Sequence, residues 1–352
     1  MTSRPIISVR NLEVGAMSRH GMLRPLRGID LDLPFGQTVG LVGESGCGKS
    51  MTARALLNIT PAPMRITGGT IILDDGKAPP QTLSALDPDG VAMRAIRGAR
   101  VAMIFQEPMT ALSPVHTIGD QIGEMVRIHR KLGRREAKAH AIEMLDMVSM
   151  PNARQRYDAY PFNLSGGMRQ RAMIAMALAC GPDVLVADEP TTALDVTIQA
   201  QILELLQRLQ ADLGMTVLLI THDLGVVART TKRVAVMYLG EIVEEASTIQ
   251  LFDTPLHPYT QGLLSSVPRL GGRRGRREPL PTMRGTVPSA LVELSGCAFH
   301  PRCPKAVAGL CDVIKPVMAE VNPGHSARCL LYPEVLAASK RRSSVVQPEP
   351  VS

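Results

Sequence analysis

The stretch "GESGCGKS" at residues 43–50 decides the fold expected for this chain. It matches the pattern G-x-x-x-x-G-K-[ST], and it stands between an apolar stretch, "TVGLV", and a helix-like stretch, "KSMTARALLN". Gly43, Gly46 and Gly48 would let the backbone curl until successive N–H groups face phosphate oxygens. The dipole of the following helix favours the same anion. This order of strand, loop and helix predicts a phosphate-binding loop.

The side chains of the loop suggest how a nucleotide is held. Lys49 is expected to reach the β- and γ-phosphates of ATP, and Ser50 is expected to ligate Mg²⁺. The residues expected to contact the nucleotide are Gly43, Glu44, Ser45, Gly46, Cys47, Gly48, Lys49, Ser50 and Met51.

A pair of acids follows a second apolar stretch, "VLVADEP" at residues 184–190. Asp188 is placed to complete the Mg²⁺ shell, and Glu189 is placed to polarise an attacking water as a general base. Two acids at the end of a strand are common on protein surfaces. Together with the phosphate loop, they predict ATP hydrolysis.

A second anion-binding helix start is expected within "LSGGMRQR" at residues 164–171, where Ser165, Gly166 and Gly167 precede a helical stretch. One nucleotide bound to the phosphate loop does not need a second anion-binding helix start in the same chain. A dimer resolves this, because each subunit's Ser165–Gly167 can close over the γ-phosphate held by its partner. The alternative is an ordinary capped helix.

Beyond these motifs, apolar stretches of strand length alternate with helical periodicity, which predicts a parallel α/β sheet. Residues 117–150 show helical spacing, and the regular alternation stops after Asp253. The stretch before residue 42 is expected to form short strands. The stretch "GGRRGRREPLP" (271–281) is expected to be a flexible basic linker.

Composition excludes some classes of protein. A hydrophobic content of 45% and a charged content of 20% describe a globular chain, and no apolar run reaches the length of a membrane span. The N-terminus lacks the apolar core of a signal peptide, so we expect a cytosolic protein with reduced thiols. The net charge of +7 does not choose among anionic partners.

Four of the six cysteines gather near the end of the chain with the spacing C-x5-C-x7-C-x17-C: Cys297, Cys303, Cys311 and Cys329. Four thiolates suit either a tetrahedral zinc or a [4Fe–4S] cube. No tight C-x2–4-C knuckle occurs, so the wide gaps favour the iron–sulfur cluster. Zinc, with His300 or His325 replacing a thiolate, and free buried cysteines are the alternatives.

With these motifs in order, residues 6–250 resemble the ATP-binding subunits of ABC transporters. The resemblance implies that Gln106 in "FQEPMTALSP" is the Q-loop residue, which senses the γ-phosphate and the Mg²⁺ site. It implies that Asp195 in "TTALD" is the D-loop residue at the dimer seam. It also implies that His222 in "THD" is the switch histidine, which bridges the γ-phosphate and Glu189.

One position departs from the family pattern. The family stacks adenine on an aromatic residue in L-x-V-x-aromatic, whereas this chain has "LEVGA", with Ala16 in place of the ring. Adenine is therefore expected to be held more weakly, or by Arg19 and its neighbours.

The C-terminal part narrows the family. "LFDTPLHPYTQGLLSSVPRL" (251–270) and "GTVPSALVELSGCAFHPRCPKA" (285–306) resemble the extension of oligopeptide and dipeptide importer ATPases, some of which carry an iron–sulfur cluster there. The resemblance implies a peripheral subunit at the cytoplasmic face of the cell (inner) membrane. Its implied partners are a second, non-identical ABC ATPase in a heterodimer, two permease subunits and an extracytoplasmic substrate-binding protein.

Other family branches remain open at this stage. A nickel, glutathione or other small-solute importer would use the same ATPase. A DNA-maintenance ATPase would carry long heptad repeats between its two halves, and this chain has none, so we expect no nucleic-acid partner.

The expected fold is an α/β, ABC-type P-loop ATPase: a RecA-like parallel core with an antiparallel β subdomain, a helical subdomain and a small cysteine-containing extension. The expected boundaries are 1–253 for the nucleotide-binding domain (helical subdomain about 107–165), 254–335 for the extension and 336–352 for a disordered tail.

Overall fold

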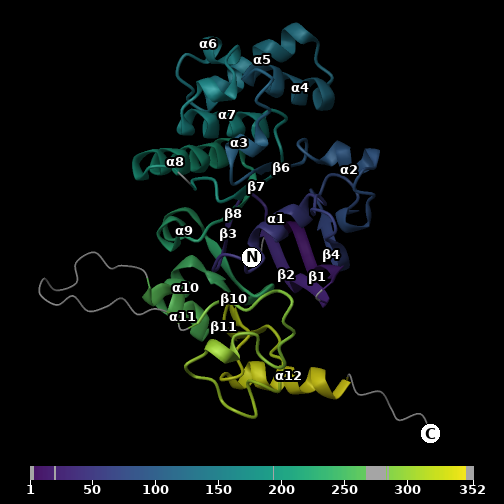
Figure 1. Cartoon of the computed structure of the whole chain (residues 1–352), viewed down its shortest axis with the longest axis vertical. Coiled ribbons are helices and arrows are strands. Elements are labelled where there is room, and N and C mark those ends of the chain that lie inside the picture. Colours follow the sequence, from purple (N-terminus) through teal and green to yellow (C-terminus); the bar gives the residue numbers. More distant parts are fainter. Residues whose placement is uncertain (1–3, 20, 193, 267–282, 284, 346–352) are drawn as a thin grey trace, which may run out of the picture.

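The computed structural model describes the chain except for residues 1–3, 20, 193, 267–282, 284 and 346–352. The predicted linker at 271–281 therefore lies outside the described residues. The described chain forms two β-sheets with helices around them (Figure 1).

The larger sheet has eight strands in the order β11-β12-β10-β9-β3-β8-β7-β6. Strands β9, β3, β8, β7 and β6 run parallel, which confirms the predicted parallel core, and β10, β12 and β11 continue the sheet antiparallel. The strands are β3 Thr38–Val42, β6 Val101–Ile104, β7 Val184–Asp188, β8 Thr216–Ile220, β9 Arg233–Tyr238, β10 Glu241–Ser247, β11 Ala319–Asn322 and β12 His325–Ala327.

The smaller sheet is antiparallel, with the order β2-β1-β4-β5. Its strands are β1 Pro5–Ser18, β2 Gly21–Pro34, β4 Arg65–Leu73 and β5 Gln81–Thr82. The prediction of short strands before residue 42 was wrong here, because β1 and β2 each extend over 14 residues. Shifts of register interrupt their pairing, for example between Val9 and Leu12, and allow the long ribbon to bend.

Helices surround the two sheets. They are α1 Lys49–Leu56, α2 Val91–Ile96, α3 Pro108–Ala111, α4 Ile118–Arg130, α5 Arg134–Met147, α6 Ala153–Tyr157, α7 Gly166–Leu178, α8 Val196–Leu213, α9 Leu224–Thr230, α10 Thr248–Asp253, α11 Pro258–Ser265 and α12 Pro333–Val345. Single 3₁₀ turns lie at Leu83–Ala85, Pro161–Asn163 and His300–Arg302. Helices α4 to α6 lie at one end of the molecule and α12 lies at the other (Figure 1). None of the described helices is both long enough and apolar enough to cross a membrane.

Alternation along the parallel strands places successive side chains in different hydrophobic cores on the two faces of the large sheet. On β6, for example, Ala102 and Ile104 join the core shared with the helical subdomain, whereas Val101 and Met103 join the core shared with the antiparallel sheet. All four side chains are at most 8% exposed. The parallel strands of the sheet are thus buried on both faces, and the ends of these strands are left to build the site.

The C-terminal part of the chain is joined to the large sheet. Strand β12 pairs with β10 through Ala327 and Ser326, so residues late in the chain continue the hydrogen bonding of this sheet. Helix α12 occupies residues 333–345, so its residues 336–345 fall in the stretch that was predicted to be a disordered tail (336–352). Residues 346–352 lie outside the described residues.

Candidate nucleotide-binding site

The phosphate loop connects the end of β3 to the start of α1, as predicted. Two of its glycines are required by close packing. A Cβ atom on Gly43 would lie 2.2 Å from the Met237 carbonyl oxygen. At Gly48, where φ is +112°, a Cβ atom would lie 2.7 Å from the carbonyl oxygen of Pro25. The loop is therefore pressed against β9 and β2, and its exposed tip is formed by Ser45 and Gly46.

Lys49 is folded back over the loop that precedes it. Its ammonium donates to the carbonyl oxygens of Gly43 at 2.8 Å and Glu44 at 3.0 Å, and the residue is only 5% exposed. A charged nitrogen held in a loop of this sequence pattern is suited to bind a polyphosphate. Neighbouring Cys47 is buried, and burial raises the pKa of its thiol.

The two predicted magnesium ligands lie together. The Ser50 hydroxyl donates to the Asp188 carboxylate at 3.1 Å. Asp188 ends strand β7 and is 3% exposed, and burial raises the pKa of its carboxyl group. A buried carboxylate beside a hydroxyl is an oxygen-rich position of the kind that Mg²⁺ prefers.

Glu189 contacts the Q-loop glutamine and the switch histidine that the family resemblance implied. Its carboxylate accepts from the Gln106 amide at 3.2 Å and lies 3.3 Å from Nδ1 of His222. Its side chain is 11% exposed, whereas that of His222 is 60% exposed and reachable from solvent. The predicted catalytic residues therefore meet beside the phosphate loop, and a carboxylate in this position can accept a proton from water.

The sequence analysis missed one member of this cluster. The Thr192 hydroxyl donates to the Glu189 carboxylate at 2.9 Å and fixes the carboxylate from a third side. The backbone at Glu189 has a φ of +45°, so the chain turns sharply after β7 and Thr192 comes to lie beside the Glu189 carboxylate. The hydroxyl pair in "DEPTT" is the signal that could have identified it.

Ser165, Gly166 and Gly167 start helix α7, as predicted. Ser165 is its N-cap, and its hydroxyl accepts from the Met168 N–H at 3.4 Å. Within the described part of the chain, no hydrogen bond or ion pair joins these residues to the loop at 43–50, and α7 is well separated from α1 in Figure 1. The structure of the single chain therefore does not bring the two anion sites together.

Asp195 caps the adjacent helix. Its carboxylate accepts from the Ile198 N–H at 3.0 Å at the start of α8. The two helix starts touch, because a Cβ atom on Gly167 would lie 2.8 Å from the Ile198 side chain.

Ala16, at the position where the family has an aromatic ring, is buried in β1 opposite Leu23 and is 7% exposed.

The four C-terminal cysteines line one small cavity together with His257, His300 and Phe299. None of them forms a disulfide. Burial raises the pKa of Cys297 to about 12 and that of Cys329 to about 11. These values hold the metal-free thiols in the protonated form at neutral pH.

The predicted metal centre is not confirmed. Among the described residues, no group of three or more His, Cys, Asp or Glu side chains is arranged to hold a metal ion. His325, considered as a substitute zinc ligand, is instead buried with Nε2 at 2.7 Å from the Glu244 carboxylate.

Comparison with known proteins gives two family matches. Residues 26–192 match the family described as ABC transporter, and residues 243–311 match the family described as oligopeptide/dipeptide transporter, C-terminal region.

Individual relatives agree with these matches. The chain is 50% identical over 331 residues to a probable peptide ABC transporter ATP-binding protein of Sinorhizobium fredii, covering 94% of this chain and 96% of that protein. It is 44% identical to a dipeptide transport ATP-binding protein of Bacillus subtilis, covering 93% and 94%. A solved dimeric bacterial ABC transporter cassette matches with a TM-score of 0.60 and 27% identity, over 69% of this chain and 98% of that one.

Proposed function

The chain belongs to the ATP-binding subunits of ABC transporters, which hydrolyse ATP, and we propose that this subunit powers the import of di- and oligopeptides. The observation that carries the ATPase role is the meeting of Gln106, Glu189 and His222 beside the Ser50–Asp188 pair. The match of residues 243–311 to the oligopeptide/dipeptide transporter C-terminal region supports peptides as the substrate class.

In the proposed reaction, the N–H groups of the loop and the Lys49 ammonium hold the phosphates of ATP. Ser50, Asp188 and Gln106 would hold Mg²⁺, which neutralises charge on the β- and γ-phosphates. Glu189 takes a proton from the attacking water, and its hydrogen bonds with Gln106 and Thr192 keep the carboxylate facing that water. His222 stabilises the charge that develops around the γ-phosphate.

The second anion site is proposed to act in a dimer. Ser165–Gly167 is remote from the loop of its own chain, so its helix start is available to the nucleotide of a second ABC ATPase. A dimeric cassette among the matching structures supports this arrangement. The proposed partner is a related, non-identical subunit, and Asp195 lies beside Ser165–Gly167 at the proposed seam.

The remaining partners follow from the proposed import. Two permease subunits form the membrane path, and an extracytoplasmic binding protein delivers the peptide. The subunit works at the cytoplasmic face of the cell (inner) membrane as a peripheral protein. The division into a nucleotide-binding domain (1–253) and an extension (254–335) is part of the same proposal.

Uptake in cells tests the substrate. Cells that lack the chromosomal copy are complemented with the unmodified chain or with Glu189→Gln, and uptake of a labelled tripeptide is compared with that of nickel and glutathione. In cells with Glu189→Gln, we expect tripeptide uptake to be lost and the uptake of nickel and glutathione to be unchanged. Loss of nickel or glutathione uptake with tripeptide uptake unchanged would contradict the proposed substrate class.

We also propose that the cysteine cavity holds a [4Fe–4S] cluster. The four cysteines line one cavity, and the backbone N–H of Val307 donates to the Cys311 sulfur over 3.4 Å. Such donors stabilise thiolates and set the properties of clusters. When bound, the cluster would supply folding energy to a segment with little core of its own.

Anaerobic purification tests this proposal. The chain should be brown, absorb broadly at about 400 nm and contain about four irons. Replacement of all four cysteines by serine should abolish the colour. Colourless protein with one equivalent of zinc would assign a different metal, and a metal-free, folded extension would refute the proposed centre.

A further inference from the structure

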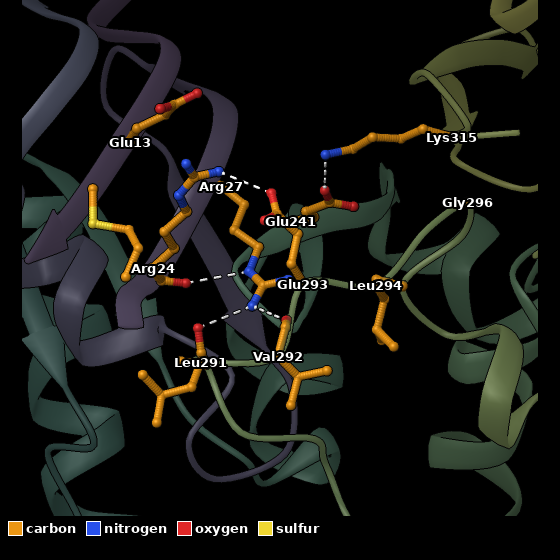
Figure 2. Close-up of a pocket in the computed structure, with 13 residues that line it drawn as sticks. Glu13, Arg24, Arg27, Glu241, Leu291, Val292, Glu293, Leu294, Gly296 and Lys315 are labelled. Carbon is orange, nitrogen blue, oxygen red and sulfur yellow. Dashed lines mark hydrogen bonds and ion pairs between the residues drawn. The ribbon is translucent and has the colours of Figure 1, made fainter. Parts of the chain in front are cut away.

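The C-terminal extension is attached to the domain close to the nucleotide site. Figure 2 shows the seam, where the Arg27 guanidinium of β2 donates to the backbone carbonyls of Ala290 at 3.1 Å and Val292 at 2.8 Å. Lys315 reaches across to Glu241 at 2.8 Å. Through these hydrogen bonds and this ion pair, the seam attaches the extension to the domain.

A second attachment reaches the phosphate loop itself. Arg302 of the extension forms a two-pronged ion pair with the Glu44 carboxylate, at 2.6 Å and 3.1 Å. The Arg302 side chain is 6% exposed and that of Glu44 is 26% exposed, so water screens this pair poorly. The guanidinium also lies over the rings of Tyr238 and Phe299, which hold it in place.

Glu44 is therefore held from three directions. Its carbonyl oxygen accepts from Lys49, its side chain binds Arg302, and its N–H donates to the Tyr259 hydroxyl at 2.8 Å. Tyr259 and Arg302 both lie after residue 253, outside the part of the chain that carries the nucleotide motifs. The extension thus fixes one residue of the loop on two of its three sides.

The charge of Glu44 needs such a partner. A carboxylate in a loop that wraps around the phosphates of ATP repels them, and this repulsion falls when a buried cation is paired with the carboxylate. Arg302 supplies that cation, and its two-pronged hydrogen bonding fixes both oxygens of the carboxylate.

We propose that Arg302 is a positioning residue of the nucleotide site: by pairing with Glu44, it neutralises and orients the phosphate loop for ATP. This inference rests on the proposed binding of ATP at residues 43–50. It makes the extension a working part of the nucleotide site, and Arg302 immediately precedes Cys303 of the cysteine cavity.

The test measures the Kd for MgATP by calorimetry at low and high ionic strength. Arg302→Ala should weaken binding about tenfold at low salt and less at high salt, because the exposed charge of Glu44 is then screened. Arg302→Lys should lose less than Arg302→Ala. Adding Glu44→Gln to Arg302→Ala should restore most of the affinity, a rescue that a purely structural role of Arg302 does not produce.

Two further variants complete the design. Arg27→Ala loosens the same extension without touching Glu44, so it should lower Tm and leave the Kd unchanged. Glu44→Gln alone leaves the Arg302 cation unpaired beside the loop, so it should bind MgATP more tightly than the unmodified chain, and it tests the proposal even when Arg302→Ala fails to fold.

The outcomes separate the two claims. Unchanged MgATP affinity in Arg302→Ala, failure of Glu44→Gln to restore it, or weaker binding by Glu44→Gln alone would overturn the role of Arg302. Absence of MgATP binding by the unmodified chain would instead overturn the proposed function.

Discussion

The Ser50 hydroxyl donates to the Asp188 carboxylate over 3.1 Å, although 138 positions separate the two residues in the chain. The first lies in the first turn of helix α1 and the second ends strand β7, so the parallel sheet is what brings them together. The pair marks where Mg²⁺ is proposed to sit between the protein and the phosphates of ATP.

The first prediction concerns this pair. Ser50→Ala should abolish most of the gain in ATP affinity that Mg²⁺ provides, because one oxygen ligand is removed. Ser50→Thr keeps the hydroxyl and should behave like the unmodified chain. Titrations with ATP in Mg²⁺ and in EDTA measure the difference, and an unchanged magnesium effect in Ser50→Ala would count against this ligand.

The second prediction concerns Lys49. Lys49→Ala should weaken ATP binding at least about tenfold, because the buried cation of the proposed phosphate site is lost. Lys77→Ala removes an exposed lysine in the antiparallel sheet region and serves as the matched control. Equal affinities for the two variants in a fluorescent-nucleotide assay would show that Lys49 does not touch the nucleotide.

The third prediction separates capping from catalysis at Ser165. Ser165 and Ser247 are both N-caps, of α7 and α10, so replacing either by alanine should cost about 1 kcal/mol of stability in urea unfolding. Only Ser165→Ala should also reduce ATP hydrolysis in the assembled transporter. Normal hydrolysis by assembled Ser165→Ala would leave this residue as a cap alone.

The fourth prediction concerns assembly. Because Ser165–Gly167 makes no polar contact with the phosphate loop of its own chain in the described residues, the isolated subunit should be mainly monomeric and a weak ATPase. Light scattering and phosphate release, with and without the partner ATPase and permeases, measure this. Strong, cooperative hydrolysis by the isolated chain would contradict an obligate mixed dimer.

The parallel core and the neighbourhood of the phosphate loop were predictable because they depend on local patterns. Apolar strands followed by glycines or acids predict which residues reach the carboxyl edge of the sheet, and Ser50, Asp188 and Glu189 lie there. The length of β1 and β2 was missed, because bulges hide the pairing register in sequence.

Contacts between residues far apart in the sequence were harder to predict. The pairing of Arg302 with Glu44 depends on how the chain around residue 302 packs against β9, and nothing in the alternation of residues near 302 indicates its partner. The four cysteines were predicted to meet at a metal. They line one cavity, but in the described residues they are not arranged to hold a metal ion, because the positions of their sulfurs depend on turns with little periodicity.

The measurement that tests the account most directly compares hydrolysis with binding in Glu189→Gln, within the assembled transporter. Loss of the general base should slow phosphate release by at least about a hundredfold while MgATP affinity stays within about threefold of normal. Glu107→Gln, an exposed acid near the same cluster, should hydrolyse ATP normally. Hydrolysis by Glu189→Gln at close to the normal rate would contradict the assignment of Glu189 as the residue that activates water.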